Sequence, residues 1–223
     1  MIRTITVERE YGAGGGAIAR KLAARLGWKL WDRELTCEIA RLAEVDQSAV
    51  ERVDERCDPL FYRLMKVFMR GSLEQSLEVE GLHQFDADSM VRFMQRVIAG
   101  AASEGNSVIV GRGAPFLLRG REDAFHVFIY APFKEKVRRL LADGKSQAAA
   151  LAELATVDRE RATFVRKYFD MEWPTRELYH LMINSQSGDE VVIDTILNEI
   201  HSLTAQAIPS HLNWSELEKG LSG

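Results

Sequence analysis

The chain has 223 residues, 46% of them hydrophobic, with a net charge of −4 and a pI near 5.8. This length permits one α/β domain with an inserted lobe, and the apolar content is sufficient for a core. The acidic balance argues against a general nucleic-acid surface, and no apolar run reaches the ~18 residues that a membrane span needs. Cys37 and Cys57 lie too far apart for a metal or redox pair, so we expect reduced thiols and a cytoplasmic protein.

Apolar periodicity predicts alternating strands and helices along the chain. In chain order we expect a strand at 1–7, a glycine turn at 12–16, a helix at 18–26, a strand at 28–32, helices at 34–43, 60–69 and 93–105, strands at 107–110 and 124–130, helices at 133–142 and 146–168, a strand at 181–183 and a helix at 191–203. The first strand lacks the long apolar region of a signal peptide. Residues beyond 209 give little signal.

The strands at 107–110 and 124–130 are continuously apolar, which is typical of buried parallel strands. Strands separated by helices predict a three-layer α/β fold with a parallel sheet covered on both faces. Ligands bind such sheets at the carboxyl ends of the strands. The glycine cluster and Gly111-Arg112 both follow strands, so we expect them to face one cleft.

The glycine cluster can bind phosphate, because it precedes a helix whose first N–H groups are free. Glycines let the backbone wrap an anion without Cβ clashes. The expected cradle consists of Gly12, Ala13, Gly14, Gly15, Gly16 and Ala17. A merely tight turn is the simpler alternative, but so many glycines exceed what a turn requires.

Two kinds of phosphate loop compete for this segment. Gly12-x-Gly14-x-x-Ala17 matches a dinucleotide fingerprint, with Asp32 about 20 residues on, where a ribose-binding acid would stand. Against it, four residues separate the expected first strand from Gly12, and the next core strand after Asp32 begins only at Ser107. The mononucleotide pattern GxxxxGK[ST] has the right length from Arg9 onward, but Arg9 replaces its first glycine and Gly15 its lysine.

Longer segments resemble the cytidylate kinase-like family. They are residues 7–15, 19–23, 26–28 and 31–35 at the start, 108–114 in the middle, and 158–162, Tyr168, Trp173, Tyr179 and 183–185 toward the end. The matches occur in order over residues 1 to about 200. The resemblance implies a P-loop nucleoside-monophosphate kinase fold in one domain, 1–223, with a helical acceptor-binding insertion near 33–100, a lid near 143–180 and a tail at 205–223.

The resemblance also implies roles for individual residues. Arg9, Arg159, Arg161 and Arg166 would place positive charge over the transferred phosphoryl group, Asn184 and Ser185 would border the donor ATP, and Asp32, Arg33 and Arg112 would bind the acceptor. Without the resemblance, 158–167 is better interpreted as a solvated charged helix, and Asp32 serves equally well as a helix N-cap. The five histidines show no metal-binding spacing.

The expected function is ATP-dependent phosphorylation of a nucleoside monophosphate, CMP or dCMP, with Mg²⁺. Two departures bear on it. Gly15 replaces the loop lysine, whose charge Arg9 or Arg20 could supply, and Gly113 stands where true cytidylate kinases carry an acid. No residue is assigned as a Mg²⁺ ligand. The alternatives are a nucleotide-binding regulatory protein of the same fold and a dinucleotide-binding oxidoreductase.

Overall fold

The computed structural model of the chain describes residues 1–32, 35 and 87–205. In chain order the elements are β1 (Thr4–Arg9), α1 (Gly15–Leu26), β2 (Lys29–Trp31), α4 (Ala87–Glu104), β3 (Ser107–Val110), α5 (Ala114–Leu117), β4 (Ala124–Tyr130), α6 (Phe133–Ala142), α7 (Gln147–Phe169), β5 (Leu181–Asn184) and α8 (Asp189–Ala205). The helices expected at 34–43 and 60–69, the two cysteines, Arg33 and most of the tail lie outside the described residues. None of the described helices is both long and apolar enough to cross a membrane.

The strands form one five-stranded sheet in the order β2-β3-β1-β4-β5, and every neighbouring pair is parallel. The α/β fold with a parallel sheet, predicted from the sequence, is therefore confirmed. Because all strands run the same way, their carboxyl ends lie at one edge of the sheet, where ligands of such folds bind. β1 lies between β3 and β4, whereas in the dinucleotide-binding order the first strand lies beside the second.

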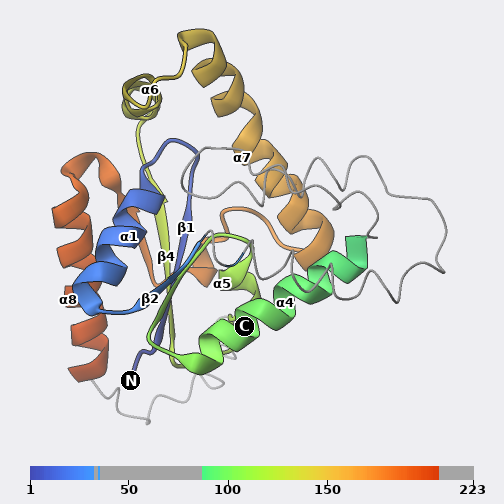
Figure 1. Cartoon of the computed structure of the whole chain (residues 1–223), viewed down its shortest axis with the longest axis vertical. Helices are drawn as coiled ribbons and strands as arrows, with labels where there is room; N and C mark the ends of the chain where they lie inside the picture. The colour runs from blue at the N-terminus through green and yellow to red at the C-terminus, as the bar shows by residue number, and fades with distance from the viewer. Residues whose placement is uncertain (33–34, 36–86, 206–223) are drawn as a thin grey trace, which may run out of the picture.

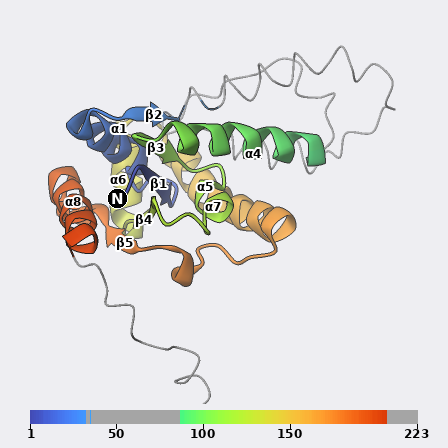
Figure 2. The same cartoon turned by 90° about the horizontal axis from the view of Figure 1, so that it is seen from below.

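Helices cover both faces of the sheet, with α1 and α8 on one side and α4, α5 and α7 on the other (Figures 1 and 2). The first core joins strand residues such as Val7 to Ile18 of α1 and Val192 of α8. The second joins Ile109 of β3 to Met94 of α4 and Phe164 of α7. α4, the described part of the expected insertion, therefore packs on the sheet.

Side chains of β1 alternate between these two cores, as in any strand. Ile5 and Val7 belong to the α1 side, which leaves Thr4, Thr6 and Glu8 on the α7 side. All six residues of β1 are buried, including Glu8 and Arg9. The second face of this central strand is therefore polar, which is unusual for a doubly covered parallel strand.

Most expected elements are confirmed with shifts of one to three residues at their ends, but the end of β1 was placed too early. The strand continues through Glu8 and Arg9, which pair with Phe128 and Ile129 of β4. Only Glu10 and Tyr11 then separate the strand from Gly12. The four-residue gap used against a dinucleotide turn was wrong, because buried polar residues gave no strand signal.

Candidate functional site

The glycine loop, residues 10–17, connects β1 to α1 at the carboxyl edge of the sheet. Gly12 and Gly14 have φ values of 73° and 75°, a left-handed conformation that favours glycine. Gly14 is the N-cap of α1, where no side chain caps the free N–H groups and no acid stands in the first turn. The start of α1 thus retains the positive end of the helix dipole for an anion.

A cleft of about 710 Å³ lies against this loop. Of the expected cradle, only Ala13 does not line it. Its cationic lining residues are Arg9, Arg20, Arg138, Arg139, Lys145 and Arg161, and its acidic ones are Glu10, Asp143 and Asp189. Cations thus outnumber acids around a set of backbone N–H donors, which favours a polyanionic ligand.

The side chain of Arg9 passes between two glycines. A Cβ atom at Gly15 would lie 2.7 Å from Arg9 Cβ and 3.0 Å from its Cγ, and a Cβ at Gly111 would overlap its Nη1. Gly111 also has a φ of 64°, which disfavours any larger residue. The arginine at the end of β1 and the glycines at 15 and 111 therefore depend on one another sterically.

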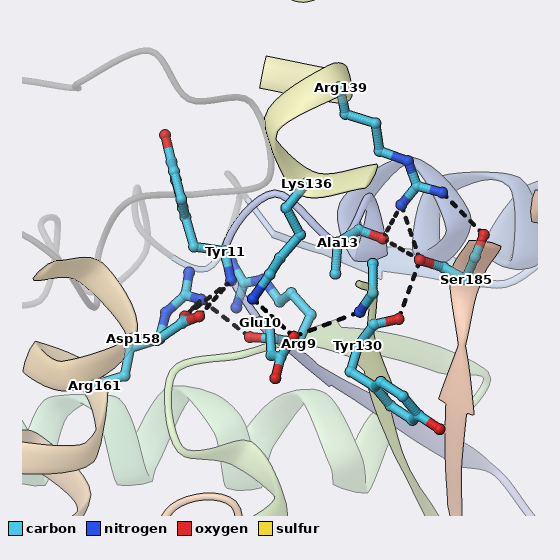
Figure 3. Close-up of polar contacts among 11 residues, drawn as sticks. Arg9, Glu10, Tyr11, Ala13, Tyr130, Lys136, Arg139, Asp158, Arg161 and Ser185 are labelled. Carbon is cyan, nitrogen blue, oxygen red and sulfur yellow. Dashed lines mark hydrogen bonds and ion pairs between the residues drawn. The ribbon is translucent and has the colours of Figure 1, made fainter. Parts of the chain in front are cut away.

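Arg139 of α6 joins the glycine loop to the turn after β5 (Figure 3). Its Nη1 donates to the carbonyl of Ala13 and to Ser185 Oγ at 2.8 Å, and its Nη2 donates to the carbonyl of Ser185 at 2.9 Å. Glu135 holds the other side of the guanidinium, with Nε 3.0 Å from Glu135 Oε1. Arg139 is thus fixed against the loop at the cleft wall.

The long helix α7 contacts the loop from the opposite side (Figure 3). The backbone N–H of Tyr11 donates to both carboxylate oxygens of Asp158, at 2.8 and 3.1 Å. Arg161 Nη1 donates to the carbonyl of Arg9 at 3.0 Å and to Asp158 Oδ1 at 3.0 Å. Burial, followed by the nearby charge of Arg9, lowers the pKa of Arg161 from its ordinary value. The first turn of the loop is therefore bound directly to the expected lid.

α6 also holds the loop through an ion pair. Lys136 Nζ lies 3.0 Å from Glu10 Oε2, and the same oxygen accepts the N–H of Ala131 at 3.4 Å. A Cβ atom at Gly12 would lie 3.1 Å from Lys136 Cβ, so helix and loop are in close contact. Loop, α6 and α7 form one connected unit around the cleft.

Among the expected phosphoryl-binding arginines, the structure brings Arg9 and Arg161 to the loop. Both are buried and line the cleft. Arg159 and Arg166 lie on the same helix but are exposed, and neither lines the cleft. Arg159 and Arg166 do lie on one face of α7, as their spacing predicts, but that face is exposed to solvent.

The residues expected to border the donor have local bonding roles. Ser185 is buried, and its hydroxyl lies within hydrogen-bonding distance of the Ala13 carbonyl, at 2.7 Å, and of the Tyr130 carbonyl, at 3.2 Å. Asn184 Oδ1 accepts the N–H of Gln186 at 2.9 Å and so caps a short turn. Neither lines the cleft beside the glycine loop.

The expected acceptor residues Asp32 and Arg112 form a buried pair beside the carboxyl ends of β2 and β3. Arg112 Nη1 lies 3.2 Å from Asp32 Oδ1 and donates to the carbonyl of Val110 at 3.1 Å. The side chain of Arg112 is fully buried, and its φ of 56° is left-handed. The structure thus brings these two residues together, and Arg33 lies outside the described residues. Neither Gly111 nor Arg112 lines the cleft beside the glycine loop, so the expectation that they face the same cleft as the glycine cluster is not met.

Mg²⁺ prefers oxygen ligands in an octahedral arrangement, usually one or two carboxylates with water and substrate phosphate. Within the described part of the chain, no three His, Cys, Asp or Glu side chains group so that they alone could hold a metal ion. Gly16 stands where the mononucleotide loop carries the hydroxyl that binds Mg²⁺. Glu10 is bound to Lys136, and Asp189 lies 2.9 Å from Lys21. The described residues therefore do not form a protein-made Mg²⁺ site.

Several contacts at the site were missed from the sequence. Arg139 follows another arginine in an amphipathic helix, and Asp158 lies in a run of charges, so neither stood out. Glu8 sits in a strand whose apolar pattern ends at Val7. The contacts of these three residues depend on which helix packs beside the loop. The local sequence pattern does not show which helix that is.

A sequence model of the cytidylate kinase-like family matches residues 4–187 of this chain. Among curated proteins, the chain is 27% identical to a uronate isomerase from Corynebacterium glutamicum over 164 residues. That match covers 73% of this chain but 31% of the relative, so the chain spans about a third of the length of that protein.

Solved structures show the same fold. An uncharacterised protein from Eubacterium ventriosum superposes with a TM-score of 0.64 at 22% identity, covering 91% of this chain and 99% of the other. A shikimate kinase from Acinetobacter baumannii, in complex with shikimate, superposes with a TM-score of 0.51 at 17% identity, covering 92% and 97%. The architecture is that of P-loop kinases.

Proposed function

Because the chain belongs to the cytidylate kinase-like family, we propose that it transfers the γ-phosphoryl group of ATP to a small acceptor. The observation that carries the proposal is the cation-rich cleft against the glycine loop, at the carboxyl edge of a P-loop kinase sheet. Phosphoryl transfer depends on positioning and on stabilising negative charge, and this cleft supplies groups for both.

The donor phosphates bind the N–H groups at the start of α1, with Gly12 and Gly14 allowing the loop to curve around them. Arg9 provides the cation that the loop lysine would otherwise supply, and Gly15 and Gly111 leave room for its side chain. Arg161 adds a second buried guanidinium beside it. Arg139 closes the wall of the cleft near Ser185.

The first acceptor to consider is a nucleoside monophosphate, CMP or dCMP, because of the family. In this proposal Asp32, Arg33 and Arg112 hold the acceptor. The buried Arg112–Asp32 pair then shapes the acceptor side at the carboxyl ends of β2 and β3, since Arg112 already binds a carboxylate and a carbonyl. A neutral hydroxyl compound is the second acceptor to consider, because a buried carboxylate, Glu8, lies near the carboxyl end of β1.

The test measures ATP binding and ADP release with Mg²⁺ and a panel of monophosphates, sugars and other alcohols. Gly14→Val should abolish ATP binding, because φ is 75° there, a conformation that a β-branched residue strongly disfavours, and a Cβ atom would also displace the Arg139 guanidinium from the loop. Gly27→Val is the matched control, since Gly27 has a similar φ of 65°, a Cβ there meets nothing within 4 Å, and it does not line the cleft. Unchanged ATP affinity in a folded Gly14→Val protein would contradict the proposal.

Two alternatives are separated by the same measurements. A regulatory protein of this fold would bind ATP tightly and release no ADP with any acceptor. An oxidoreductase would be stabilised by NADH and not by ATP, because a ligand that binds only the native state raises its Tm.

A further inference from the structure

Glu8 is a buried carboxylate at the reactive edge of the sheet. It is the penultimate residue of β1, directly before Arg9, and its side chain lies on the α7 face with Thr4 and Thr6. Only 2% of the residue is exposed. Carboxylates are rarely buried to this extent without a role that repays the loss of hydration.

One oxygen of Glu8 is bonded and the other is not. Oε1 accepts the N–H of Arg9 at 3.2 Å and lies 3.6 Å from Arg9 Nη1. Oε2 has no hydrogen-bond partner among the residues that the structure describes. A buried acceptor without a donor costs free energy, and such atoms call for an explanation.

Two unused donors lie on the same side of the sheet. Glu8 is in register with Phe128 of β4, and the rings of Trp173 and Tyr179 pack on Phe128 with centroids 5.5 and 5.0 Å away. Within the described ranges, Trp173 Nε1 and the Tyr179 hydroxyl are also buried without partners. Burial raises the pKa of Glu8, and burial followed by the charge of Glu8 raises the pKa of Tyr179, so Tyr179 remains a donor.

Phe128 thus connects the three groups: Glu8 pairs with it across the sheet, and the rings of Tyr179 and Trp173 pack on it, yet the Glu8 oxygen and the two donors do not bond one another. A hydroxyl group complements them, since it donates one hydrogen bond and accepts others. We propose that Glu8 binds the hydroxyl of an alcohol acceptor and takes its proton, with Tyr179 and Trp173 donating to the same oxygen.

In this step the acceptor oxygen forms a bond to the γ-phosphorus while the bond between that phosphorus and the leaving oxygen of ADP breaks. The hydroxyl proton passes to Glu8 Oε2 and later to water. Arg9, 3.6 Å from the other carboxylate oxygen, links Glu8 to the donor side of the cleft. The acceptor alcohol and the donor phosphate thus meet between two consecutive residues of β1.

This inference rests on the proposed phosphoryl transfer and changes its acceptor from a monophosphate to a hydroxyl compound. A phosphate monoester attacks through an oxygen that is already ionised, so it requires no base. Its negative charge would also be repelled by a buried carboxylate. An alcohol requires a proton acceptor, and general bases of this kind contribute about 10²–10⁴-fold to rate.

The experiment compares the full-length wild type with Glu8→Gln, Glu8→Asp and Tyr179→Phe. Glu104→Gln serves as the matched control, because Glu104 is an exposed carboxylate that pairs with Lys29. ADP release is measured with CMP, dCMP, shikimate, monosaccharides and glycerol, and also without acceptor, where water occupies the hydroxyl position. ATP affinity and Tm are measured for every variant.

We expect an alcohol to be phosphorylated and Glu8→Gln to lower kcat about 10²-fold or more, with ATP affinity changed less than threefold. Glu8→Asp should restore part of the rate, and Tyr179→Phe should raise the KM of the alcohol more than that of ATP. The wild-type kcat should fall toward acid pH as Glu8 becomes protonated, and this decline should be absent in Glu8→Gln. The charged groups facing Glu8 are Arg9 of β1 and Arg161 and Asp158 of α7.

Phosphorylation of CMP with an unchanged kcat in Glu8→Gln would overturn this inference and leave the proposed function intact. If no panel compound is phosphorylated, the rate of ATP hydrolysis without acceptor is compared instead. Equal hydrolysis rates in wild type and Glu8→Gln would also overturn the role of Glu8 as a base. Absence of ATP binding in the wild type would instead refute the proposed function. If Glu8→Gln lowers the Tm of the protein and lowers kcat with every acceptor, the loss of activity reflects unfolding and Glu8 has a structural role.

Discussion

The side chain of Arg9 occupies the space that a side chain at position 15 would need, so Gly15 fits beside it and a larger residue does not. The Cβ and Cγ atoms of Arg9 fill the space in which a side chain at position 15 would begin, at 2.7 and 3.0 Å from a Cβ built there. In the mononucleotide pattern these two positions hold glycine and lysine, respectively. Relative to that pattern the glycine and the cationic residue are interchanged, and a side chain at position 15 fits only if the side chain of Arg9 moves or is removed.

The exchange predicts opposite results for single and double substitutions. Gly15→Lys should weaken ATP binding and lower turnover, because the new side chain collides with Arg9. The double variant Arg9→Gly/Gly15→Lys should have a kcat/KM at least tenfold higher than that of Gly15→Lys, since it rebuilds the usual loop. Titration with ATP and ADP-release assays on the three proteins check this. Higher activity in Gly15→Lys alone would show that Arg9 does not fill that space.

Arg161 should matter more for transfer than the exposed arginines of α7. Arg161→Lys is expected to lower kcat strongly, on the order of 10³-fold, with a modest change in ATP affinity, because Nη1 is held by Asp158 and the Arg9 carbonyl while the rest of the planar guanidinium, which lysine lacks, is available to phosphate. Arg159→Lys and Arg166→Lys should have much smaller effects. Similar losses in all three variants would mean that α7 reorients when ATP binds.

Arg139 should control donor binding. Arg139→Ala removes the hydrogen bonds to Ala13 and Ser185, which are worth about 1–3 kcal/mol in total. We expect ATP affinity to fall about tenfold or more, as measured by titration. Lys134→Ala is the comparison, because Lys134 is an exposed cation of α6 that does not line the cleft and should have a smaller effect. Equal affinities for wild type and Arg139→Ala would refute this role.

His126 should destabilise the fold at acid pH. Burial, followed by the neighbouring His180, lowers its pKa from 6.5 to about 4, and its Nδ1 lies 2.7 Å from Thr6 Oγ1. The native state therefore resists protonation, so the stability is present above pH 6.5 and is lost as pH falls toward 4. The loss amounts to about 3 kcal/mol at 1.36 kcal/mol per pKa unit.

Thermal unfolding of wild type and His126→Asn between pH 4 and 7.5 tests this. The variant should show a flatter dependence of Tm on pH over that range, whereas His201→Asn, an exposed histidine of α8, should follow the wild type. A wild-type slope that persists in His126→Asn would assign the acid sensitivity to other groups.

The amino-acid sequence by itself determined the fold class, the order of the described strands and helices except the short helix α5, and the glycine loop before α1. These features depend on local pattern: apolar runs form buried strands, four-residue spacing forms helices, and clustered glycines permit the left-handed turns at Gly12 and Gly14. The family and the expected kinase function were inferred from segments that resemble the family and occur in the same order along the chain. Length and charge alone would not have distinguished this fold from others.

Tertiary structure decided which side chains reach the cleft. Arg159 and Arg161 are indistinguishable in sequence, but the packing of α7 on β1 buries Arg161 and leaves Arg159 in solvent. Arg139 is separated from Ala13 by 126 residues and meets it only because α6 packs beside the loop. Glu8 gave no strand signal, since a buried acid is tolerated only where distant groups surround it. The site is formed by contacts between segments that lie far apart along the chain. Such contacts leave no local periodicity from which they could be predicted.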